Sequence, residues 1–212
     1  MRRIGVIYSG NESHYRTFHE PKFNQYIKKL IYHPDFLETD IDDLDVLIVP
    51  SQLNNKLLLA SVSKIHSFAE KGGIVVAFGP QPWNWLPAQQ WEERPTNFWW
   101  WLEKDASSGL VLQKPEHPLF NGYLTLADCT WHQHGVFWPP DNADILVTTE
   151  DGGAVLYIYT ASTGGTWIIT TLDPDFHFGS YFMPATERFL EGFFPHLAFG
   201  KISQNTDSKA NP

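Results

Sequence analysis

A short apolar run between two glycine-containing turns constrains this sequence most. Gly72-Gly73 ends a stretch with helical periodicity, residues 74–78 are apolar without interruption, and Gly79-Pro80 stops the run. An unbroken apolar run rich in β-branched residues is typical of a strand that helices bury on both faces of a sheet. Ligands of such sheets bind beyond the carboxyl ends of the strands. Residues 79–82 are therefore predicted to border a binding site.

The segments on the N-terminal side of this run have the patterns of further strands and of helices, and together they predict an α/β domain. Residues 3–8 and 45–50 resemble further buried strands, and residues 56–71 carry apolar side chains at helical spacing. The second strand, this helix and the run at 74–78 make a βαβ unit, whose crossover is right-handed. A helix is also predicted from Pro21, which suits a first helical turn, to about residue 31.

The second half of the sequence is richer in strands, and a helix closes it. The predicted strands are residues 135–138, 143–148, 154–160 and 166–171, and the predicted helix is 184–194. One domain over residues 1–200 is expected, followed by a polar tail, residues 201–212, that is expected to be disordered.

Composition narrows the classes of function. The formal net charge of −9 argues against a nucleic-acid-binding protein, because no basic face is available to neutralise phosphates. No apolar run approaches the roughly 20 residues that cross a bilayer, so no membrane partner is expected. The single Cys129 excludes an internal disulfide framework, and with the short apolar segment at the N-terminus it favours a cytoplasmic protein.

Three stretches together resemble a known superfamily. They are the βαβ unit 45–79, the segment His117-Pro118-Leu119-Phe120-Asn121-Gly122, and the closing strand from Gly165-Thr166-Trp167 to Thr171-Leu172-Asp173. In this order, over residues 3–199, they are similar to the class I glutamine amidotransferase-like superfamily, in its trehalose-utilisation-like branch. The resemblance implies a flavodoxin-like fold: a mostly parallel central sheet with helices on both faces. An aromatic-rich insertion, from Trp83 to Trp101, is expected beside it.

The resemblance also implies what is missing. Active members of the superfamily carry a nucleophilic Cys in the turn after the strand that matches residues 74–78, with a His partner near the position of His177. Here the turn reads Gly79-Pro80-Gln81-Pro82, which holds no Cys, Ser or Thr, and proline lacks the N–H that an oxyanion hole would use. Glutamine hydrolysis is therefore not expected. The branch often lacks that Cys, and some of its members are linked to carbohydrate use.

His132 and His134 are the metal-like signal of the sequence. Residues two apart on a strand share a face, so both imidazoles could reach one divalent ion. The alternative is a pair of ordinary hydrogen-bonded histidines. No other cofactor is expected. Cys129, three residues before His132, lacks the strand-turn-helix setting that activates a thiol and is interpreted as a buried structural residue.

Asp173, Asp175 and His177 follow the last predicted strand. A His beside a carboxylate titrates near neutral pH, so Asp175 and His177 are candidate acid and base residues. The alternative is a turn at Asp173-Pro174-Asp175 that caps a helix.

The sequence thus favours a non-catalytic module that binds a small polar, sugar-like molecule at the carboxyl ends of the parallel strands. The residues expected to line that site are Ser9, Ser51, Gly79, Gln81, Trp83, Asp173, and with them His132, His134 and His177. One alternative is a hydrolase that uses Asp175 and His177, with or without a metal at His132 and His134. Another is an interaction domain that forms homo-oligomers through the Trp-rich segment between Trp83 and Trp101.

Overall fold

The structure, a computed structural model, describes residues 1–88, 90–96, 102–161, 164–181 and 183–202. Within them the chain forms a ten-stranded mixed sheet in the order β2-β1-β3-β4-β10-β9-β7-β5, with β8 paired to β9 and β6 paired to β8. The strands are β1 (Ile4–Tyr8), β2 (Ile27–Tyr32), β3 (Val46–Val49), β4 (Ile74–Ala77), β5 (Trp91–Glu93), β6 (Leu110–Leu112), β7 (Gly135–Phe137), β8 (Asp144–Thr149), β9 (Ala154–Thr160) and β10 (Thr166–Thr170).

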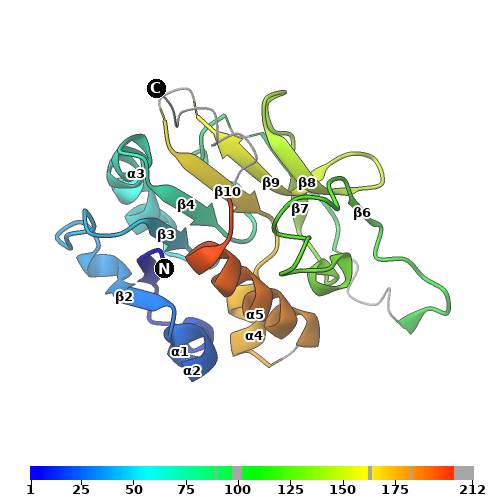
Figure 1. Cartoon of the computed structure of the whole chain (residues 1–212), viewed down its shortest axis with the longest axis horizontal. Coiled ribbons are helices and arrows are strands. Elements are labelled where there is room, and N and C mark those ends of the chain that lie inside the picture. Colours follow the sequence, from blue (N-terminus) through cyan, green and yellow to red (C-terminus); the bar gives the residue numbers. More distant parts are fainter. Residues whose placement is uncertain (89, 97–101, 162–163, 182, 203–212) are drawn as a thin grey trace.

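The sheet divides into a parallel and an antiparallel half. β2, β1, β3, β4 and β10 run parallel, and β10 is also antiparallel to β9. The helices are α1 (Glu12–His19), α2 (Pro21–Asn24), α3 (Asn55–Glu70), α4 (Pro174–Gly179) and α5 (Pro184–Phe199). In Figure 1, α3 lies on one side of the parallel strands, and α4 and α5 lie on the other. This is the predicted α/β, flavodoxin-like arrangement.

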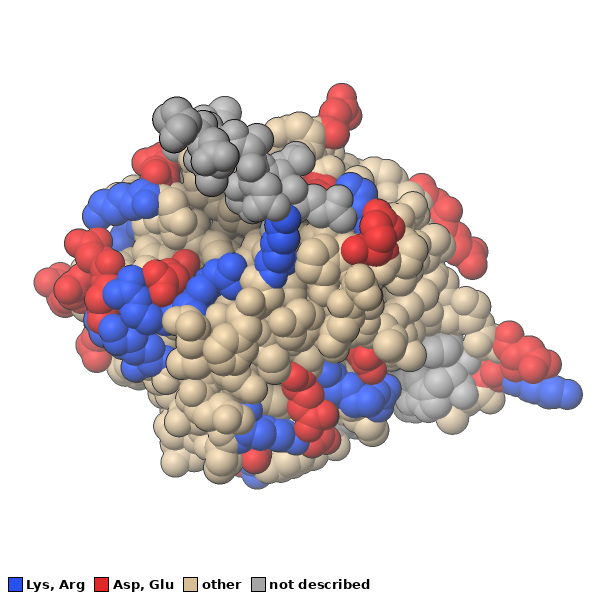
Figure 2. All heavy atoms as spheres, in the orientation of Figure 1, with Lys and Arg blue, Asp and Glu red and all other residues tan. Residues whose placement is uncertain are grey.

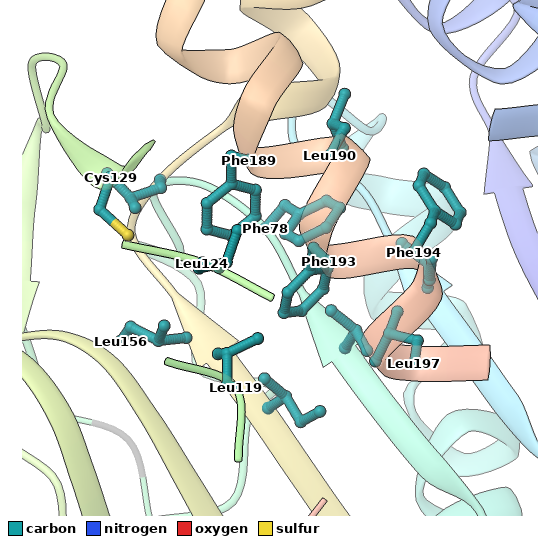
Figure 3. Packing of buried hydrophobic residues seen from close by; sticks show 14 of the residues in the cluster. Phe78, Leu119, Leu124, Cys129, Leu156, Phe189, Leu190, Phe193, Phe194 and Leu197 are labelled. Carbon is teal, nitrogen blue, oxygen red and sulfur yellow. The ribbon is translucent and has the colours of Figure 1, made fainter. Parts of the chain in front are cut away.

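Successive side chains of the parallel strands point to opposite faces of the sheet and pack into two apolar clusters, one on each face. Val46 and Ile48 of β3 join the cluster beneath α5, whereas Leu47 and Val49 join the cluster beneath α3. Figure 3 shows the first cluster, in which the ring of Phe78 lies 5.6 Å from that of Phe193 between their centroids. Burial on both faces explains why these strands are apolar at every position.

The charged residues at the β2 edge are paired with opposite charges. Lys28 and Lys29 both contact Asp43, and Arg3 contacts Asp45. Figure 2 accordingly shows basic and acidic side chains next to one another on the face in view. Among the described residues, no helix is long and apolar enough to cross a membrane.

The predicted helix over residues 21–31 is wrong. α2 ends at Asn24, and residues 27–32 form the edge strand β2, parallel to β1. The structure packs three side chains of this stretch partly against the core: Tyr26, Ile27 and Leu30. Their spacing in the sequence fits a helix and a short strand equally well. Two lysines on β2 suit an edge strand, because they discourage pairing with another chain.

The other predicted elements are found close to their predicted bounds. α5 runs five residues beyond the predicted end, from Pro184 to Phe199, and Ile202 still packs into the core. Residues 203–212 of the predicted tail lie outside the described residues. The same holds for Trp99-Trp100-Trp101, the part of the Trp-rich segment whose replacement would test the oligomerisation alternative.

Candidate functional site

The carboxyl ends of the parallel strands place four of the predicted residues along one edge of the sheet. Ser9 follows β1, Ser51 follows β3, Gly79 follows β4 and Asp173 follows β10. Gly79 has a φ of +81°, and a Cβ added to it would lie 2.6 Å from the Cβ of Ser51 and 3.3 Å from that of Asp173. The turn after β4 therefore needs glycine for its conformation and for its space.

A buried chain of polar groups, which we call the polar relay, runs through Ser9, His14, Asp175 and Ser51. Ser51 donates to Asp175 Oδ2 from its backbone N–H, at 3.0 Å, and from its hydroxyl, at 2.9 Å. His14 Nε2 lies 3.1 Å from the same oxygen, and Ser9 Oγ lies 2.9 Å from His14 Nδ1. His14 and Asp175 are fully buried, whereas Ser9 is half-buried.

α1 and α4 bring the relay together. Asn11 caps α1 by accepting from the backbone N–H of His14, which turns the imidazole inward beside Thr17. The Thr17 hydroxyl donates to the backbone oxygen of Asp175 at 2.6 Å, so the two helices are joined directly at the relay. Pro174 opens α4, where its missing N–H costs nothing.

Asp173 and His177 form a second polar group next to the relay. Trp131 Nε1–H donates to Asp173 Oδ1 at 3.2 Å, and His177 Nε2 lies 3.3 Å from that oxygen. Burial and the nearby Asp175 raise the pKa of Asp173 well above its ordinary value. Burial lowers the pKa of His177 to about 4. Burial therefore favours the neutral form of both the carboxyl group and the imidazole.

The structure brings His132, His134 and His177 together. The ring centroids of His132 and His177 are 4.6 Å apart, and those of His132 and His134 are 5.3 Å apart. Burial, aided by the two neighbouring rings, lowers the pKa of His132 to about 4. In the described part of the chain, no group of three or more His, Cys, Asp and Glu side chains is arranged to hold a metal ion. A metal at His132 and His134 stays a prediction, which elemental analysis of the purified protein would test.

The state of Asp173 gives a prediction for stability. A carboxyl whose folded-state pKa is raised contributes stability below its unfolded-state pKa, near 3.8, and that contribution is lost as the pH rises. The neutral, isosteric Asp173→Asn should therefore increase the free energy of unfolding at pH 7 by about 1 kcal/mol. The gain should shrink to nothing as the pH falls to about 4. Urea unfolding across this pH range measures both effects.

Asp128→Asn is the matched control for this prediction. Asp128 accepts from Thr125 and Arg188, and its pKa is lowered overall even though burial, the largest single influence, raises it. Its carboxylate contributes stability above the unfolded-state pKa, so this variant should be less stable at pH 7. If Asp173→Asn also lost stability at pH 7, the conclusion would be that Asp173 is charged and paired in the folded protein, and the prediction of a neutral Asp173 would be rejected.

Two hollows adjoin each other outside the polar relay, along the turns after β3 and β4. Their volumes are about 290 Å³ and 280 Å³, and Gln52, Pro80 and Pro82 line both. We call the two together the turn groove. The first is also lined by Pro50, Leu53, Asn55, Leu58, Gln81 and Trp83, and the second by Trp91, Glu93 and His134.

The walls of the turn groove combine aromatic and polar groups. Trp83 is 43% exposed, and Glu93 and His134 add a carboxylate and an imidazole at the other end. Trp91 carries a buried Nε1–H that has no hydrogen-bond partner within the described ranges. Gln52, which both hollows share, has a φ of +57°, a strained conformation of the kind that clusters at ligand sites.

The predicted site residues thus fall into two sets. Gln81, Trp83 and His134 line the turn groove, although Gln81 itself is almost fully buried and accepts from Trp85 Nε1. The other set lines neither hollow and is buried or half-buried: Ser9, Ser51, Gly79, His132, Asp173, Asp175 and His177. Asp175 contacts Ser51 and His14, whereas His177 contacts Asp173.

Residues outside the predicted set also contribute to these features, and Cys129, which was expected to be buried, is buried. The sequence reasoning missed Gln52, and it missed His14, whose signal was the spacing of His14, Thr17 and Phe18 after a capping Asn11. Cys129 is fully buried in the core shown in Figure 3, and burial raises the pKa of its thiol. A thiol in that state is a poor nucleophile.

Comparisons with known proteins identify the fold. No protein-family model and no curated protein matches the sequence. Among solved structures, a cytoplasmic protein of Salmonella typhimurium matches 92% of this chain and 98% of its own length, at 11% identity and a TM-score of 0.54. A ThuA-like protein of Bacteroides uniformis matches 91% of this chain and 89% of its own length, at 13% identity and a TM-score of 0.50.

A larger enzyme contains the same fold. An exo-β-1,4-mannosidase of an Opitutaceae bacterium matches 93% of this chain over 36% of its own length, at 11% identity and a TM-score of 0.52. At these identities the likeness concerns the fold.

Proposed function

We propose that this chain, which has the fold of ThuA-like proteins, binds a small polyhydroxylated molecule of the sugar class in the turn groove. The observation that carries the proposal is the composition of that groove: an exposed Trp83 at one end, Glu93 and His134 at the other, and strained Gln52 between them. It lies beyond the carboxyl ends of β3 and β4, where α/β sheets bind their ligands.

Each wall of the groove suits a different part of a sugar. The apolar face of a pyranose ring stacks on an indole, and Trp83 offers such a face to solvent. Hydroxyl groups donate to carboxylates and exchange hydrogen bonds with amides, which Glu93 and Asn55 supply. An apolar ligand would leave these polar groups without partners, which disfavours it.

The choice of first probes follows from this reasoning. One protein of the same fold is an exo-β-1,4-mannosidase, so mannose and β-1,4-linked mannobiose are the first ligands to screen. Intrinsic tryptophan fluorescence is a direct readout, because a sugar stacked on Trp83 changes the environment of a solvent-exposed indole.

Replacing Trp83 tests the proposal. Trp83→Ala should weaken sugar binding at least tenfold, which corresponds to about 1.4 kcal/mol, because the stacking face is lost. Isothermal titration with the best sugar from the screen measures the dissociation constant.

Phe199→Ala is the control for this experiment. Phe199 is 60% exposed at the end of α5. The backbone N–H of Arg2, which precedes β1, donates to Ala198 O at that helix end, so Phe199 lies near the amino ends of the parallel strands, away from the turn groove. This variant should bind like the parent chain. Equal affinities of the parent chain and Trp83→Ala would reject the turn groove as the sugar site.

A further inference from the structure

The turn from β1 into α1 presents one hydroxyl that the sugar proposal does not use. Ser9 follows the strand, Gly10 has a φ of +83°, and α1 begins at Glu12. Such a strand-turn-helix connection holds a side chain at the sheet edge in a fixed position. Ser9 is half-buried, whereas His14 and Asp175 are fully buried.

Hydrogen bonding fixes which nitrogen of His14 carries the proton. The backbone N–H of Ser9 donates to His14 Nδ1 at 3.3 Å, so Nδ1 is an acceptor. In the neutral ring the proton then resides on Nε2, which lies 3.1 Å from Asp175 Oδ2 but makes no hydrogen bond within the described residues. The hydroxyl of Ser9, 2.9 Å from Nδ1, therefore has a proton acceptor next to it. The backbone N–H of Asn11 contacts the same hydroxyl oxygen at 3.2 Å.

Asp175 is held in place and is only partly satisfied. Both hydrogen bonds from Ser51 and the contact with His14 reach Oδ2. Oδ1 is buried and has no hydrogen-bond partner among the residues that the structure describes. A fully buried carboxylate with one bare oxygen is costly to maintain, and such groups concentrate at sites that carry chemistry.

We propose that Ser9, His14 and Asp175 form a nucleophile–base–orienting triad that hydrolyses small carboxylic esters. Ser9 is the nucleophile, His14 is the general base, and Asp175 is a positioning residue that orients the imidazole and stabilises its protonated form. The proposal rests on the polar relay and is independent of sugar binding in the turn groove.

The reaction has two balanced halves. Ser9 Oγ attacks the ester carbonyl carbon, its proton passes to His14 Nδ1, and the bond to the alkoxy oxygen breaks. The leaving alcohol takes the proton from His14, and the acyl group stays on Ser9. Water then attacks the acyl carbon, gives its proton to His14, and releases the carboxylic acid as Ser9 regains its proton.

Covalent labelling tests the nucleophile directly. A fluorophosphonate probe should label the parent chain, because Ser9 displaces fluoride from phosphorus. Mass spectrometry should place the label in the tryptic peptide 4–16, which also contains Ser13. Ser9→Ala should lose the label, and the matched control Ser13→Ala should keep it. No labelling of the parent chain, or a label on Ser13, would overturn the proposal.

Ester hydrolysis tests the other two roles. With p-nitrophenyl acetate, Ser9→Ala and His14→Gln should lower kcat at least a hundredfold. Asp175→Asn should lower kcat while KM stays the same, because Asp175 does not touch the substrate. Circular dichroism of each variant confirms that it is folded. Hydrolysis by a folded Ser9→Ala at the parent rate would also overturn the proposal.

Discussion

Replacing Gly179 by Ala is expected to lower the free energy of unfolding by about 3 kcal/mol and to separate the two helices that form the polar relay. A Cβ at Gly179 would lie 2.0 Å from the backbone oxygen of Ser13. Because that atom belongs to the backbone of α1, no side-chain rotation relieves the clash, and α1 has to move away from α4.

The movement has a local signature beyond the loss of stability. His14 is on α1 and Asp175 is on α4, so their 3.1 Å contact should lengthen in Gly179→Ala. The 2.6 Å hydrogen bond from Thr17 to Asp175 should weaken with it. Urea unfolding measures the loss of stability, and hydrogen exchange of the α1 amides measures the loosening of α1 from α4.

Ser180→Ala is the control for the Gly179 prediction. It changes the exposed residue next to Gly179 and removes a hydroxyl that donates to the backbone oxygens of Phe176 and His177. Its stability should stay within about 0.5 kcal/mol of the parent chain. If Gly179→Ala were equally stable, the close packing of α1 on α4 would be refuted.

The second large effect is expected at Gly79, in the turn that follows β4. Gly79→Ala should cost about 3–4 kcal/mol, because it combines a left-handed backbone with a Cβ 2.6 Å from Ser51. Gly72→Ala separates the two causes. Gly72 also has a positive φ, +96°, but a Cβ there meets nothing within 4 Å, so only the conformational cost of about 1 kcal/mol remains.

The comparison between these two glycine variants is made by chemical denaturation. The difference between their free energies of unfolding gives the steric part of the Gly79 effect. Gly79→Ala should in addition shift Ser51, and so disturb the carboxylate of Asp175 that Ser51 binds. Equal losses in the two variants would contradict the tight approach of Ser51 to the turn.

The fold could be predicted where an element is buried enough to leave a pattern. β3, β4 and α3 were recognisable because burial on two faces demands unbroken apolar runs and burial on one face demands helical spacing. β2 was not, because it is an edge strand whose few apolar residues fit either period. The pairing partner that decides the matter, β1, is visible only in three dimensions.

The candidate site could be predicted only by position along the sheet edge. The rule that ligands bind at carboxyl ends of strands led to Ser51, Gly79 and Asp173, and the structure places Gly79 against both of the others. That rule does not say which side chains turn inward. Trp83 and Asp173 were predicted for one site, but Trp83 is partly exposed to solvent and Asp173 is buried.

The position of β10 at the junction of the two half-sheets has a consequence for how the chain assembles. β4 is made early, yet its second neighbour in the sheet is residues 166–170. Ser51 and Asp175, which bond to each other, are 124 positions apart. Until the last quarter of the chain emerges from the ribosome, β4 therefore has an open edge of backbone donors and acceptors, and closing such a distant contact is slow. We therefore expect this half-finished sheet to be an aggregation-prone state of the chain during synthesis.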